Sequence, residues 1–139
     1  MKLSIERRLI QGVIAATCTV SLSASVTSIL EGPGWLMADG GVATDLDSHF
    51  RYLSGLLLAI AIGFLSCMRG IEQKGPRLRL LALIVVVGGL SRAYSAGVVG
   101  MPSFGHLGGL TIELVIVPIV TAWQWSFARR ANREAAALL

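Results

Sequence analysis

Charged residues are scarce in this chain. Lysine, arginine, aspartate and glutamate make up 14% of its 139 residues, against about 25% in soluble domains, while hydrophobic residues make up 54%. So little charge excludes an ordinary soluble domain, because most of these apolar side chains would have to face water. The net charge of +4 does not indicate nucleic acid, because the basic residues lie at the ends of apolar runs and not in one patch.

Cysteine and catalytic motifs are also lacking. Cys18 and Cys67 are too few for a disulfide framework, and their expected depths in a membrane differ by roughly 12 Å. That separation is beyond disulfide reach, so both are predicted to be packing residues. The sequence has no glycine-rich phosphate loop, nucleophile elbow, carboxylate pair or zinc-ligand spacing. We therefore expect no catalytic residue, no metal and no cofactor.

What the chain does have is four apolar runs of membrane-spanning length. They predict helices at about residues 9–30, 48–68, 78–100 and 107–128. The polar segment 31–47 is predicted to be an extracytoplasmic loop, and the segment 129–139 a basic cytoplasmic tail. We therefore predict an all-α fold in which residues 1–139 form one transmembrane domain, an integral membrane four-helix bundle.

The first apolar run leaves two alternatives open. A basic start, an apolar core and small residues near Ser21–Ser25 are features of a signal peptide. A retained helix of 22 residues would be about 33 Å long, enough to cross a hydrocarbon core. Its Ser and Thr residues would then suit a face that packs on other helices. We favour the retained helix.

Lysine and arginine predict how the chain is threaded. Ten of the twelve lie in the N-terminus, the second connection and the C-terminal tail, counting Arg79 just inside the third helix. The first and third connections hold none. The positive-inside rule therefore predicts that both termini are cytoplasmic.

Small residues recur every four positions in two of the predicted helices. They are Gly55, Ala59 and Gly63 in the second helix, and Gly89, Ala93 and Gly97 in the third. This pattern is typical of closely packed transmembrane helices. Pro118 lies inside the fourth helix and is expected to kink it.

Apart from Arg79 at the inner end of the third helix, three charged residues fall inside the apolar runs: Arg51, Arg92 and Glu113. A charge within the membrane costs about 2.5–3.5 kcal/mol on insertion scales, so each needs a reason to be there. All three are expected roughly 5–12 Å below the outer boundary, with Asp47 and His49 at the rim of the same site. Glu113 is the natural partner of Arg92, because their helices are joined by a short turn. Arg51 is left with Asp47, Glu113, a helix-end carbonyl or a ligand.

This polar cluster has several interpretations. Two arginines near one carboxylate would leave a positive pocket suited to a lipid head group or a small anionic amphiphile. The charges could instead form a salt-bridge network that only fixes helix register, as in a structural subunit of a larger membrane complex. Glu113 could serve a proton-coupled carrier, and Glu113 or His49 could be the base of a lipid-modifying enzyme. His49 and His106 are expected to be interface histidines bound to water.

The motifs around these charges resemble a known family. They are His49–Gly55, Gly88–Arg92, and Glu113–Val115 continuing through Pro118 to Trp123-Gln124. This set, from about residue 45 to 124, is similar to the domain-of-unknown-function 4345 family of small bacterial four-helix membrane proteins. The resemblance implies a four-helix membrane bundle and carries no assigned activity.

We therefore expect a multi-pass protein of the bacterial inner (cytoplasmic) membrane that serves as a binding or accessory module and not as an enzyme. Its expected partners are the lipid bilayer, a lipid or small anionic ligand, and a homo-oligomer or larger membrane complex. Nucleic acid is not expected among them.

Overall fold

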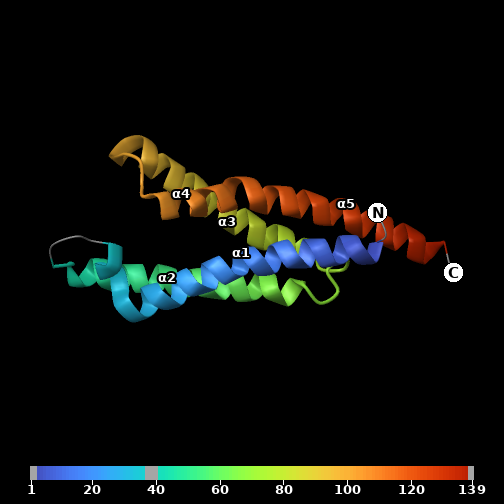
Figure 1. The fold of residues 1–139 in the computed structure, drawn as a ribbon, viewed down its shortest axis with the longest axis horizontal. Coiled ribbons are helices and arrows are strands. Elements are labelled where there is room, and N and C mark those ends of the chain that lie inside the picture. The colour runs from blue at the N-terminus through green and yellow to red at the C-terminus, as the bar shows by residue number, and fades with distance from the viewer. Residues whose placement is uncertain (1–2, 37–40, 138–139) are drawn as a thin grey trace. The chain divides into compact units, whose positions relative to one another are not determined.

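All regular structure in the described part of the chain is helical. This computed structural model describes residues 3–36 and 41–137; residues 37–40 of the predicted loop and 138–139 of the predicted tail lie outside them. The elements in chain order are α1 (Leu3–Glu31), the 3₁₀ turn η1 (Gly32–Leu36), α2 (Thr44–Cys67), α3 (Gly75–Val99), α4 (Phe104–Thr111), the π-helical turn η2 (Ile112–Ile116) and α5 (Val117–Ala136) (Figure 1).

Within the described residues, four continuous helical spans are long and apolar enough to cross a membrane. They are Leu3–Gly34, Thr44–Cys67, Gly75–Val99 and Phe104–Ala136. Each exceeds the roughly 20 residues that a hydrocarbon core requires. The fourth span is continuous because α4, η2 and α5 follow one another without a break. The prediction of an all-α protein with four membrane-length helices is confirmed.

The helices extend past most of the predicted ends. α1 begins at Leu3, six residues before the predicted start at residue 9. α2 begins at Thr44 and so takes the end of the predicted loop 31–47 into its first turn. The two aspartates of that turn complement the positive end of the helix dipole. α5 runs on to Ala136 through most of the predicted tail, because its Ala, Arg and Glu residues are strong helix formers.

The chain divides into two compact units. One consists of Met1–Ile14 and Cys67–Leu139, and in it α3 packs against α4, η2 and α5. The other is Ala15–Ser66, which holds the rest of α1 and nearly all of α2. The predicted charged site draws Arg92 and Glu113 from the first unit and Arg51, Asp47 and His49 from the second.

The first unit combines an apolar core with one fully buried and one half-buried side-chain amide. The most deeply buried apolar side chains are Ile10, Ile71, Leu78 and Phe127. Gln124 is also fully buried, and its Nε2 donates to the carbonyl oxygen of Ile71 at 2.6 Å. Gln11 Nε2 donates to the carbonyl oxygen of Met68 at 2.8 Å. Both amides therefore bond backbone carbonyls of the turn before α3. In an apolar setting, leaving these carbonyl oxygens without a donor would be costly.

The second unit shows how the hydroxyl-rich part of α1 is tolerated. Ser25 Oγ donates to the carbonyl of Ser21 at 2.6 Å, and Ser21 Oγ donates to the carbonyl of Thr17 at 3.3 Å. Each hydroxyl thus bonds back to its own helix and needs no other partner. The thiol of Cys18 donates to the carbonyl of Ala61 in α2 at 3.6 Å.

Candidate functional site

Arg92 of α3 and Glu113 of η2 form an ion pair within membrane-length spans. The Nη2 atom of Arg92 lies 3.1 Å from Oε1 of Glu113. The Arg92 side chain is 35% exposed and the Glu113 side chain 16%, so the carboxylate is the more deeply buried partner. Pairing offsets part of the cost of burying either charge alone.

Gly89 allows α3 to approach the turn that carries Glu113. This glycine is buried, and a Cβ added to it would lie 2.8 Å from Leu114 Cδ2 and 2.9 Å from Glu113 Cβ. Only a residue without a side chain fits so close to a neighbouring helix. Because Arg92 follows Gly89 by about one helical turn, this close approach also sets the distance between Arg92 and its carboxylate.

Glu113 lies on the irregular turn of the fourth span. The N–H of Val117 bonds to the carbonyl of Ile112, five residues earlier, which defines the π-helical turn η2. Pro118 follows immediately and has no N–H to continue the ordinary ladder. A wide turn therefore lies on the N-terminal side of Pro118, and the predicted kink at Pro118 itself stays a prediction. Such turns are rare and occur often at functional sites.

The ion pair leaves part of its hydrogen-bonding capacity unused. Glu113 Oε2 is buried and has no hydrogen-bond partner within the described residues. Arg92 carries five N–H groups and makes one hydrogen bond to the described part of the chain, the bond to Glu113. Gly109 lies beside it, since a Cβ placed there would be 3.8 Å from Arg92 Nη1. The pair can therefore still donate from Arg92 and accept at Glu113.

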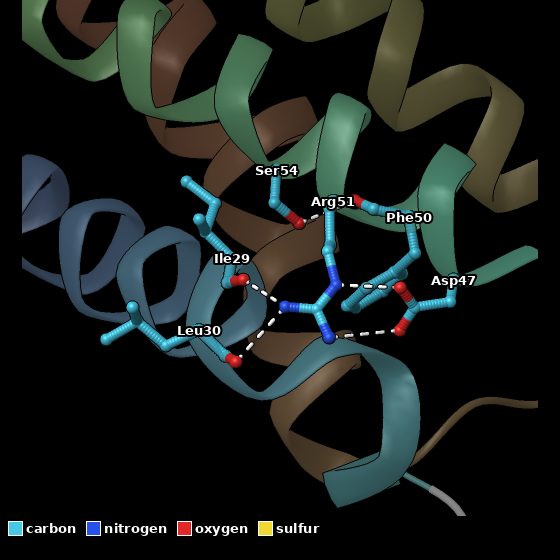
Figure 2. Close-up of polar contacts among 6 residues, drawn as sticks. All are labelled: Ile29, Leu30, Asp47, Phe50, Arg51 and Ser54. Carbon is cyan, nitrogen blue, oxygen red and sulfur yellow. Dashed lines mark hydrogen bonds and ion pairs between the residues drawn. The ribbon is translucent and has the colours of Figure 1, made fainter. Parts of the chain in front are cut away.

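Arg51 has a different and more complete set of partners, all in the second unit (Figure 2). Its Nε and Nη2 donate to the two carboxylate oxygens of Asp47 at 2.7 and 3.1 Å. Its Nη1 donates to the carbonyl oxygens of Ile29 and Leu30, the latter at 3.1 Å. These carbonyls belong to the last turn of α1, where no further helical N–H is available to them. Arg51 therefore caps the C-terminal end of α1 while Asp47 holds the guanidinium in place.

Gly32 makes room for this cap. Its φ of +69° is in the left-handed region typical of a glycine that ends a helix. A Cβ at Gly32 would fall on the Asp47 carboxylate and 2.6 Å from Arg51 Nη2. The end of α1, the start of α2 and the Arg51 guanidinium are therefore fitted to one another.

The predicted site residues fall into two groups. Arg92 is paired with Glu113 in the first unit, and Arg51 with Asp47 in the second. A single site built from all three charges stays a prediction. His49 is exposed, with its ring centroid 6.4 Å from that of Tyr52 on the same helix.

The small-residue positions also differ among themselves. Gly89 makes the close contact described above, whereas a Cβ on Gly97 would meet nothing within 4 Å in its own unit. The same holds for Gly55 within the second unit. Packing by these two glycines stays a prediction.

A second polar cluster was missed by the sequence analysis. Glu6 is buried, accepts a hydrogen bond from Trp123 Nε1 at 2.8 Å and forms an ion pair with Arg130. The sequence placed Arg130 in the basic tail, and Trp123 was named only among the residues of the family motif. The sequence did contain a signal for this contact. Glu6 is an acidic residue in a basic N-terminus, and the predicted topology puts it at the same end of the protein as the indole N–H of Trp123.

One family model matches the chain. It is described as Domain of unknown function (DUF4345), and the match covers residues 8–124, which adds most of α1 to the expected range. Comparisons with curated proteins and with solved structures find no match.

Proposed function

The chain belongs to the Domain of unknown function (DUF4345) family, and from that premise we propose a non-enzymatic binding module of the bacterial inner membrane. Its site is the Arg92–Glu113 pair, and its ligand is a lipid or a small anionic amphiphile. Four membrane-length helices support the membrane setting. The basic residues at both termini and in the α2–α3 turn support an orientation with both ends in the cytoplasm.

The unfinished hydrogen bonding of the pair carries this proposal. A buried carboxylate oxygen without a donor is unfavourable, and Glu113 Oε2 is such an atom among the described residues. A ligand with a hydroxyl or ammonium group would complete it. Arg92 is partly exposed and suited to a phosphate or carboxylate oxygen. The ligand therefore carries an anionic oxygen for Arg92 and a hydrogen-bond donor for Glu113, with an apolar part in the bilayer.

Arg51 contributes less to such a site than its charge suggests. Its guanidinium already bonds both oxygens of Asp47 and two backbone carbonyls of α1. An anion bound there would have to displace Asp47 or leave a helix end uncapped. We therefore assign ligand binding to Arg92 and a structural role to Arg51.

Native mass spectrometry of the protein extracted with its lipids tests the proposal. Wild type is compared with Arg92→Gln and Glu113→Gln, and with Arg133→Gln as a control, because Arg133 is an exposed arginine near the end of α5. We expect the wild type and the control to carry a defined extra mass that is lost in Arg92→Gln and reduced in Glu113→Gln. A bare protein mass in all four samples would overturn the proposal and favour a structural subunit.

A small proton-coupled carrier is the second candidate, favoured by the same buried oxygen of Glu113. A carboxyl group inside a span can take up and release a proton during transport. Proteoliposomes with an internal pH dye would report proton entry. Proton entry that is seen with the wild type and abolished in Glu113→Gln would favour the carrier. If protons enter with neither protein, the binding module remains the favoured function.

A further inference from the structure

We propose that a groove between α3 and α5 binds one anionic phospholipid, with an acyl chain in the groove and the phosphate on Arg79 and Arg129. This site is separate from the Arg92–Glu113 pair. Arg79 lies in the first turns of α3 and Arg92 is thirteen positions later, about 20 Å along the helix. In a hydrocarbon core of about 30 Å, the two sites therefore lie in opposite leaflets.

The groove is an open hollow of about 380 Å³ in the first unit. Ala82 and Val86 of α3 form one wall, and Pro118 and Ala122 of α5 form the other. The alanines leave the space, since larger side chains at both positions would fill it. The walls are apolar, so a hydrocarbon chain fits between them and a polar head group does not.

One end of the groove is cationic. Arg79 lines it beside Trp125, and the guanidinium carbon of Arg129 lies 4.9 Å from the centre of the Trp125 ring. Tryptophan at the end of a membrane span marks the level of the lipid head groups. Both arginines are exposed and therefore reach that level from the apolar walls.

These two arginines differ from the paired arginines of the same unit. Arg7, Arg92 and Arg130 each form an ion pair with a carboxylate. Within residues 3–36 and 41–137 no hydrogen bond or ion pair joins the guanidinium group of Arg79 or Arg129 to another residue, so the N–H groups of both side chains remain available to a phosphate.

The charge of the groove selects the class of lipid. No acidic side chain lines it among the described residues, so an ammonium head group finds no partner there. Arg79 and Val86 are seven residues apart, about 10 Å along α3, so the groove fits within the depth of one bilayer leaflet of about 15 Å. The occupant is therefore a single phospholipid with a net negative head group. In the orientation proposed above it comes from the cytoplasmic leaflet.

Titration of the full-length protein in neutral detergent with phosphatidylglycerol or phosphatidylcholine, read by native mass spectrometry, tests this inference. Arg79→Gln and Arg129→Gln together are compared with Arg77→Gln, which removes an exposed arginine of the same turn that does not line the groove. We expect the double variant to bind phosphatidylglycerol about tenfold more weakly. Arg77→Gln and all phosphatidylcholine binding are expected to stay unchanged.

Ala122→Phe tests the acyl part of the site. The ring would fill the groove while every charge remains, so phosphatidylglycerol binding is expected to fall as in the double variant. Circular dichroism checks that each variant keeps its helices.

An equal loss in Arg77→Gln, or no loss in Ala122→Phe, would overturn the inference, because binding would then follow surface charge alone. Loss in Arg92→Gln with none in the Arg79 and Arg129 variant would also overturn it. That result would assign the lipid to the Arg92–Glu113 pair and leave the proposed function standing.

Discussion

Arg51 and Arg92 show how two arginines in apolar spans can have different roles. Arg51 bonds one carboxylate and the carbonyls that end α1, so most of its N–H groups are used inside the protein. Arg92 makes one bond to Glu113, and Glu113 keeps a buried oxygen without a donor within the described chain. Both arginines need a reason to be in a span, and Arg92 retains more hydrogen-bonding capacity for a further partner than Arg51 does.

The Arg92–Glu113 pair predicts a characteristic pattern of stability. Arg92→Met or Glu113→Met alone leaves the other charge without its partner, at an expected cost of about 3 kcal/mol, the low end for a buried pair because Arg92 is partly exposed. The double variant removes both charges and is expected to unfold at a higher temperature than either single variant. Thermal unfolding in detergent measures all four proteins. Single variants as stable as wild type would show that the pair contributes little to stability.

The π-helical turn shows what could be predicted at the scale of an element. Pro118 indicated an irregularity in the fourth span, because proline removes a backbone donor. The sequence did not indicate that the wide turn would precede the proline, nor that it would carry Glu113. The close approach of Gly89 to this turn was not indicated either, because it joins residues far apart in the chain.

Gly89 and Gly97 provide a matched pair of substitutions on one helix. Gly89→Ala places a methyl group within 3 Å of Leu114 and Glu113, and we expect overpacking to cost about 1–3 kcal/mol. Gly97→Ala meets no neighbour in its own unit and is expected to be neutral or to stabilise by up to about 1 kcal/mol. Thermal unfolding in detergent compares them. Equal effects of the two substitutions would contradict the close approach at Gly89.

At the scale of the whole molecule, membrane-length helices were predictable because each span satisfies its own backbone hydrogen bonds, so the length and composition of an apolar run suffice. The partners of the charges were less predictable. Four partners were open for Arg51, and the structure selects Asp47 and helix-end carbonyls because α2 begins early enough to place Asp47 on the same helix, four residues before Arg51. The contact of Glu6 with Trp123 joins the two ends of the chain, which no local pattern reports.

The role of α1 in both units leads to a prediction about the mature protein. In the first unit Glu6 bonds Trp123 and Arg130, and in the second Arg51 caps the end of α1. Cleavage near Ser21–Ser25 would remove Glu6 and leave the indole N–H of Trp123 without this acceptor. It would also remove most of the helix whose C-terminal end Arg51 caps. We therefore expect α1 to remain attached. Intact mass measurement of protein purified through a C-terminal tag checks this.

Substitutions at Glu6 and Arg130 test the same contacts through the thermal stability of the protein. Glu6→Gln keeps an acceptor for Trp123 and removes the charge that pairs with Arg130, so the protein is expected to retain α1 and to unfold at a lower temperature. Arg130→Gln should lower the unfolding temperature too, because it leaves the buried Glu6 carboxylate with one donor instead of two. A mass that shows cleavage near Ser21–Ser25 would contradict the prediction. The contacts of Glu6 would then belong only to the precursor, and Trp123 would need another acceptor in the mature protein.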